Sequence, residues 1–187
     1  MKKTPKAKCA FPPKCVVDTN VPKISNLAVD LDGIEKELMN VVEEAARAVE
    51  WFTEQTGVLI LDEQEEIFEE YLNQLNSSGQ PGLGDAFMKW VCAHRFTDGK
   101  CERVPINKDR REKTYDEFPI HEGLKDFDPS DRKFVAVANA HPEKPPILEG
   151  TDSKWWGWKD ALADVGIAVV FLDEKYVKTK YGKKLGE

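Results

Sequence analysis

Short, continuously apolar runs alternate with amphipathic stretches along most of this chain, and that alternation limits its fold more than any other feature. The apolar runs are four to six residues long and cover 15–18, 58–61, 145–148 and 167–172. The amphipathic stretches repeat apolar residues every three or four positions, as helices do, over 34–52, 67–75, 87–94, 129–141 and 158–165. Apolar strands joined through helices form a parallel sheet that is covered on both faces. We therefore predict an α/β fold with a central parallel sheet.

The 187 residues are expected to form one main domain. Residues 1–14 are rich in lysine and proline and predict a flexible lead-in, 15–173 predict the folded domain, and 174–187 predict a basic tail. Within the domain, the apolar period fails over 96–127. A segment of that length without regular structure is uncommon in a compact domain and is often functional, so we interpret 96–127 as an irregular insertion.

The charge balance restricts the classes of partner. Lys and Arg number 27 and Asp and Glu number 34, which gives a formal net charge of −7. This argues against a protein that binds nucleic acid through its whole surface, but not against an enzyme that meets phosphates through a metal ion and local basic patches. The sequence has no apolar run of membrane-spanning length, and its four cysteines include no CxxC pair. We expect a cytoplasmic protein with reduced thiols and no membrane partner.

Three acids from distant parts of the sequence are expected at one edge of the sheet. Asp18 ends the first strand, Asp152 follows a later strand, and Asp131 lies at the start of the helix before that strand. Ligands of open parallel sheets bind beyond the carboxyl ends of the strands. Massed carboxylates repel one another unless a cation binds or their pKa values rise. Mg²⁺ and Mn²⁺ suit such all-oxygen sites, so the pattern predicts a metal centre.

Each of these acids also has a local structural explanation. Asp18 is suited to an Asx turn with the two residues that follow it, and Asp152 to the N-cap of the tryptophan-rich helix. Asp131 is suited to the first turn of a helix that Asp128 caps. Three such coincidences at one sheet edge are less expected than one metal site.

Three segments in this order resemble the PIN-domain nucleases. They are V-V-D-T-N-V around Asp18, D-R-K-F-V-A-V-A from Asp131, and I-L-E-G-T-D ending at Asp152. The resemblance covers about residues 15–173. It implies a three-layer α/β/α sandwich and divalent-metal-dependent cleavage of RNA, usually single-stranded.

The resemblance also implies a role for individual residues. The acids implied to bind Mg²⁺ or Mn²⁺ and to support catalysis by activated water are Asp18, Glu70, Asp131 and Asp152. Residues implied to support them are Thr19, Asn20 and Thr151. Helical periodicity does not distinguish Glu69 from Glu70, whereas the family pattern favours Glu70. A solvated acidic helix face is the alternative for both.

The chain departs from the family at Lys154, where many members carry a further acid. A lysine there either weakens a second metal site or contacts a substrate phosphate. Trp156 is the candidate for stacking on an RNA base, whereas Trp155 and Trp158 are expected to pack in the core. The basic segments 108–113 and 175–184 are expected to be solvated or to guide a phosphate backbone.

The sequence thus predicts a metal-dependent endoribonuclease, acting as the toxin of a toxin–antitoxin pair or in defence or RNA processing. The alternative is a catalytically degenerate PIN-like module that binds RNA or a protein. Expected partners are an RNA substrate, an antitoxin or other protein, and a second copy of the chain. The helix that carries Phe87 and Trp90 is the candidate dimer surface.

Overall fold

The structure, a computed structural model, describes residues 11–54, 56–109, 111 and 113–186. Most of the expected lead-in, residues 1–10, therefore lies outside the described residues. None of the helices in the described part of the chain has both the length and the apolar character needed to cross a lipid bilayer.

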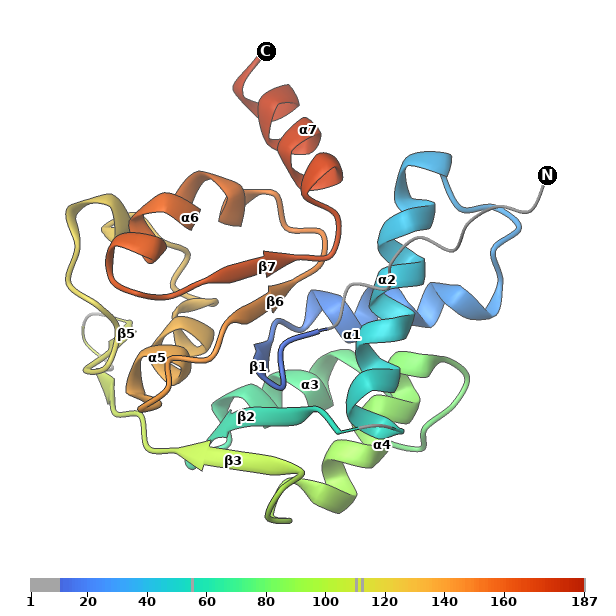
Figure 1. Cartoon of the computed structure of the whole chain (residues 1–187), viewed down its shortest axis with the longest axis horizontal. Helices are drawn as coiled ribbons and strands as arrows, with labels where there is room; N and C mark the ends of the chain where they lie inside the picture. Colours follow the sequence, from blue (N-terminus) through green and yellow to red (C-terminus); the bar gives the residue numbers. More distant parts are fainter. Residues whose placement is uncertain (1–10, 55, 110, 112, 187) are drawn as a thin grey trace.

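A five-stranded parallel sheet forms the centre of the molecule, in the order β3-β2-β1-β6-β7 (Figure 1). Its strands are β1 (Lys14–Val17), β2 (Val58–Asp62), β3 (Cys101–Val104), β6 (Ile147–Glu149) and β7 (Val169–Phe171). The chain builds outward from β1 to β3 and then returns to place β6 on the other side of β1. The strand order therefore reverses between β1 and β6, which is where open α/β sheets form their ligand crevice.

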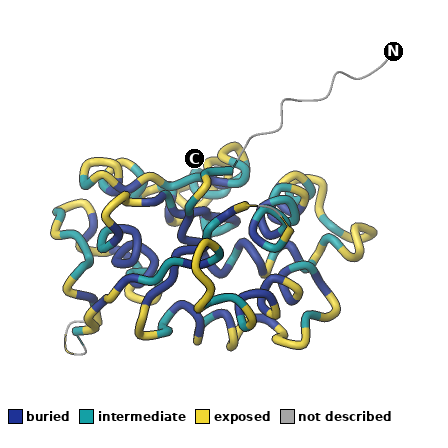
Figure 2. The backbone as a smooth tube through the Cα atoms, turned by 60° about the horizontal axis from the view of Figure 1, so that its bottom comes forward, coloured by how far each residue is buried: buried dark blue, intermediate teal, exposed yellow. Residues whose placement is uncertain are grey.

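Helices cover both faces of this sheet and complete a three-layer α/β/α sandwich, which confirms the predicted fold class. On one side lie α1 (Asn20–Ser25), α2 (Lys36–Thr53) and α4 (Leu83–His94), which contact one another. The opposite side carries α5 (Arg132–Ala140) and α6 (Lys154–Asp164) (Figure 1). Buried residues follow the strands and the inner helix faces, and exposed residues lie on the outside (Figure 2).

Aromatic side chains fill the layer between the sheet and α4. The Phe87 ring lies 5.7 Å from that of Tyr71, on α3 (Glu66–Gln74), and 6.1 Å from that of Phe52, measured between centroids. Phe87 is fully buried and Trp90 is 9% exposed. The face of α4 that carries these two residues therefore packs inside the protein, and the dimer surface expected on this helix stays a prediction.

The segment 96–127, expected to be irregular, contributes the edge strand of the main sheet. β3 pairs with β2 in parallel, and its central residues are polar, Glu102 and Arg103. An edge strand needs no continuous apolar run, which is why the apolar pattern did not reveal it. The same segment holds the 3₁₀ helix η2 (Glu122–Leu124) and a hairpin of β4 (Lys108–Asp109) and β5 (Thr114–Tyr115).

Two further helices were absent from the sequence prediction. Residues Asn20–Ser25 form α1, which continues into the 3₁₀ helix η1 (Asn26–Val29). The expected basic tail forms α7 (Glu174–Leu185), which begins where the Asp173 side chain accepts a hydrogen bond from the N–H of Tyr176 at 3.0 Å. Val177 is fully buried and attaches α7 to the domain. One apolar anchor among many lysines leaves little periodic signal.

Replacement of Phe87 by alanine tests the aromatic layer. Phe87→Ala should lower the free energy of unfolding by about 3–5 kcal/mol, because it removes a buried ring and leaves a cavity. Chemical denaturation measures the change. The matched control is Ile120→Ala, since Ile120 is fully exposed and its truncation should change stability by less than about 0.5 kcal/mol. Equal losses in the two variants would contradict the packing described above.

Candidate carboxylate site

Asp18 lies at the junction of β1 and β6. Its backbone N–H donates to the carbonyl of Leu148 at 3.0 Å, which continues the pairing of the two strands. Its side chain is only 2% exposed. Oδ1 accepts a 2.7 Å hydrogen bond from the N–H of Asn20, the first residue of α1. The Asx turn expected as the local alternative is thus present, and it fixes the carboxylate at the carboxyl end of β1.

Glu149 is a second buried acid at this edge, and the sequence prediction missed it. It is the last residue of β6 and is fully buried. Oε1 accepts the backbone N–H of Asp152 at 3.0 Å, whereas Oε2 is buried and has no hydrogen-bond partner among the described residues. A charged residue in the otherwise apolar run I-L-E-G was the available signal. The unpartnered oxygen is the site's most unusual feature, because buried polar atoms are nearly always paired.

Asp131 and Asp152 approach from the starts of α5 and α6. Asp131 occupies the N-cap position of α5, and its Oδ1 accepts a hydrogen bond from Ser130 Oγ at 3.1 Å. The helix therefore starts later than predicted, and Asp128, the expected cap, bonds Ser130 instead. Asp152 precedes α6 and its Oδ1 accepts the N–H of Lys154 at 2.9 Å, while the N-cap position belongs to Ser153.

Burial and mutual repulsion raise the pKa values of Asp18, Asp131 and Glu149. Burial, followed by the charge of Asp131, raises the pKa of Asp18 to about 8, although the Asn20 N–H opposes the shift. Burial, followed by the charge of Asp128, raises the pKa of Asp131 to about 6. Burial, followed by the charge of Asp18, holds the pKa of Glu149 well above its ordinary value. The charge of Asp152 contributes to all three shifts, so the four acids act on one another as one cluster, here called the carboxylate cluster.

Glu70, and not Glu69, faces this cluster. Thr19 Oγ1 donates to Glu70 Oε1 at 2.5 Å, and the ammonium of Lys133 lies 2.6 Å from Glu70 Oε2. Glu69 is exposed. The sequence prediction missed Lys133, which is 8% exposed and also donates to the carbonyl of Ser130. A lysine within the otherwise apolar stripe of α5 was the available signal.

The other predicted residues lie around the margin. Lys154 is half-exposed, and its ammonium is 3.0 Å from Asp128 Oδ2. Thr151 is partly exposed beside Asp152. The Trp156 ring packs 5.4 Å from that of Phe171, and the ammonium of Lys159 lies 5.0 Å from its centroid. These contacts of Trp156 are with β7 and its own helix.

The donor chemistry of the carboxylate cluster fits a hard divalent cation, but the described residues hold no ready-made metal centre. No group of three or more His, Cys, Asp or Glu side chains in the described ranges is arranged to hold a metal ion. Several cluster oxygens instead accept protein hydrogen bonds, as those of Asp18, Asp131 and Asp152 do. The all-oxygen donors and the unpartnered Glu149 Oε2 nevertheless match what Mg²⁺ or Mn²⁺ prefers.

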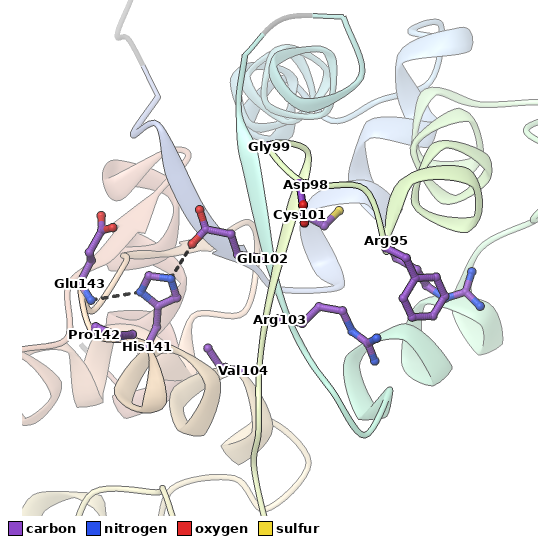
Figure 3. A pocket seen from close by; sticks show the side chains of 11 residues that line it. Arg95, Asp98, Gly99, Cys101, Glu102, Arg103, Val104, His141, Pro142 and Glu143 are labelled. Atoms are coloured by element: carbon purple, nitrogen blue, oxygen red, sulfur yellow. Dashed lines mark hydrogen bonds and ion pairs between the residues drawn. The ribbon is translucent and has the colours of Figure 1, made fainter.

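A hollow of about 690 Å³ lies along the edge strand β3 (Figure 3). Three of its residues form a hydrogen-bonded chain: His141 Nε2 lies 2.8 Å from Glu102 Oε2, and the N–H of Glu143 donates to His141 Nδ1 at 3.1 Å. None of the four clustered acids lines it. The carboxylate cluster therefore remains the candidate site for chemistry.

Comparisons with protein-family models, with curated proteins and with solved structures gave no match for this chain.

The raised pKa values predict how the stability of the metal-free protein depends on pH. The folded chain holds protons on Asp18 and Asp131 more tightly than the unfolded chain, whose aspartates titrate near 3.8. The folded state therefore binds more protons between about pH 4 and pH 8, and the free energy of unfolding should fall as pH rises across that range. Thermal unfolding in EDTA measures it. Asp18→Asn should make the decline shallower, and an unchanged slope would contradict the raised pKa of Asp18.

Proposed function

We propose that this protein is a divalent-metal-dependent ribonuclease that hydrolyses phosphodiester bonds at the carboxylate cluster. The observation that carries the proposal is the unpartnered Oε2 of buried Glu149, a carboxyl that the charge of Asp18 repels. Burying several carboxylates without cations costs stability, and proteins keep such arrangements mainly at functional sites. A cation bound by the cluster would offset that repulsion. We also propose that its substrate is RNA and that it acts as a toxin, in defence or in RNA processing.

The residues proposed to hold the ion are Asp18, Asp131, Asp152 and Glu149. Their backbone surroundings orient them: the Asn20 N–H holds Asp18, and the Asp152 N–H holds Glu149. Glu70, held by Thr19 and Lys133, lies at the margin of this set and adds negative potential.

Bound Mg²⁺ or Mn²⁺ supplies Lewis-acid stabilisation of a phosphodiester and favours ionisation of a nearby water. In the hydrolysis, the water oxygen would bond to phosphorus and lose a proton to solvent, while the bond from phosphorus to the leaving sugar oxygen breaks and that oxygen takes up a proton. The carboxylate cluster, by holding the ion, would position the water and the phosphodiester. Lys133 places a positive charge next to the cluster, where it would offset charge that develops on the phosphate.

A catalytically inactive PIN-like binding module is the second candidate. The ion pair between Lys133 and Glu70 favours it, because a cation from the protein then occupies part of the acidic surface. Lys154 in place of a further acid points the same way. Calorimetric titration with Mn²⁺ separates the two candidates, since only the nuclease requires tight metal binding.

Neutralising Asp131 tests the proposed activity. Asp131→Asn should lower the rate of RNA cleavage in Mn²⁺ by about 100-fold or more, because stabilisation worth several kcal/mol depends on the ion. The fold should persist, since the change removes repulsion. Cleavage of a labelled single-stranded RNA measures the rate. Asp126→Asn, at an exposed acid outside the cluster, is the control and should cleave as the wild type does. Wild-type cleavage by Asp131→Asn would refute the assignment.

Thermal unfolding with and without Mn²⁺ tests Glu149 as a ligand. Glu149→Gln keeps an oxygen for the Asp152 N–H but removes a carboxyl whose ionisation the folded state disfavours, so the metal-free variant should melt at a higher temperature than the wild type. The Mn²⁺-induced rise in melting temperature should shrink by an amount equivalent to about tenfold weaker binding. Asp62→Asn, at a buried acid that accepts the N–H groups of Glu66 and Ile67, is the control and should keep the wild-type Mn²⁺ shift.

A further inference from the structure

A second, basic hollow of about 520 Å³ lies between the β4–β5 hairpin and the start of α5. Lys108 and Lys113 line it from the hairpin segment, and Lys133 lines it from α5. Glu66 is the one acid among the described residues of its wall. Three lysines thus line the hollow with one acid, in a chain whose formal net charge is −7. Lys108 pairs with that acid, and Lys133 pairs with Glu70 beside the hollow. The volume is in the range of about 300–1,000 Å³ that is typical of small-ligand sites. We call it the lysine hollow.

The lysine hollow shares a wall with the carboxylate cluster. Ser130 lines the hollow, and its hydroxyl donates to Asp131 Oδ1 at 3.1 Å. Lys133 also lines it, and its ammonium reaches Glu70 at 2.6 Å. β5 packs beside α5 in the same region (Figure 1). A group bound in the hollow would therefore be a close neighbour of a group bound at the carboxylates.

Protein contacts hold two of the lysines in place. The Lys108 ammonium lies 2.7 Å from Glu66 Oε2, which also accepts a hydrogen bond from the Tyr115 hydroxyl at 3.2 Å. Lys133 is buried and donates to the carbonyl of Ser130. Lys113 is exposed, and within the described ranges no carboxylate pairs with it. An anion entering the hollow would meet ammonium groups that are largely positioned beforehand, which lowers the entropic cost of binding.

We propose that the lysine hollow binds a backbone phosphate of an RNA strand, next to the phosphate that faces the carboxylate cluster. Lysine ammonium groups bind phosphate oxygens through charge-assisted hydrogen bonds. The choice of RNA as the ligand rests on the proposed function, whereas the preference for phosphate follows from the charges of the hollow. Through this site an otherwise acidic chain can bind a polyanion locally. The role of the hairpin within 96–127 is then to supply two of the lysines that bind it.

Fluorescence anisotropy with a labelled single-stranded RNA tests this site, with EDTA present so that metal-dependent cleavage does not occur. The test protein is the double variant Lys108→Gln/Lys113→Gln, in which both changed side chains are exposed and the fold should be kept. It should bind RNA about tenfold more weakly at low salt. The slope of log affinity against log salt should fall by about 1.4, since each lost phosphate contact contributes about 0.7 for a single strand.

The matched control is Lys36→Gln/Lys89→Gln, which removes the same charge from exposed positions on α2 and α4, outside the hollow. It should bind with nearly the wild-type affinity and salt slope. Equal effects of the two double variants, or wild-type affinity in both, would overturn the lysine hollow as a phosphate site.

The binding assay separates this proposal from the proposed function. Weaker RNA binding by the hairpin variant, together with normal cleavage by Asp131→Asn, would support the hollow and overturn the catalytic assignment. Normal RNA binding by the hairpin variant, together with an inactive Asp131→Asn, would support the nuclease and overturn the hollow.

Discussion

The pairing of β1 with β6 is the constraint on which the rest of the site depends. The hydrogen bond from the Asp18 N–H to the Leu148 carbonyl places the end of one strand beside the end of the other. This pairing brings the side chains of Asp18 and Glu149 to the same edge of the sheet, and both are buried. The return of the chain from β3 to β6 then brings the start of α5, and with it Asp131, to the same edge. Carboxylates that are more than a hundred residues apart in the sequence therefore lie close enough to repel one another.

This arrangement works against the stability of the metal-free fold. Burial and repulsion raise the pKa values of Asp18, Asp131 and Glu149, which means that the folded state disfavours their charged forms. The aromatic layer beneath α4 and the buried residues of β1, β2 and β6 provide the apolar burial that offsets this cost. The protein therefore combines a well-packed core with a strained edge. That combination is typical of a functional site that rests on a rigid scaffold.

Two lysines form ion pairs beside the carboxylate cluster. Lys133 pairs with Glu70 on one side, and Lys154 pairs with Asp128 on another. Neither pair supplies a partner for the unpaired oxygen of Glu149. The acids and the lysines thus occupy adjoining surfaces of opposite charge, which suits a ligand that carries a cation at one point and phosphates at others. The lysine hollow extends the positive surface onto a hairpin that is peripheral to the main sheet.

The sequence by itself determined the fold class and three acids of the cluster, because apolar periodicity, strand ends and helix starts are local properties that can be read from the order of residues. Asp18, Asp131 and Asp152 were identified in this way. Only the tertiary structure decided what depends on neighbours distant in the chain. β3 is recognisable through its pairing with β2, α7 through its contacts with the domain, and Glu70 rather than Glu69 through Thr19 and Lys133. Glu149 shows the difference most clearly. The sequence shows that a glutamate stands at this position, but only strand pairing buries it near Asp18 with one oxygen unpaired. The dielectric surroundings of a charge are set by every element packed around it, so they cannot be read from the sequence.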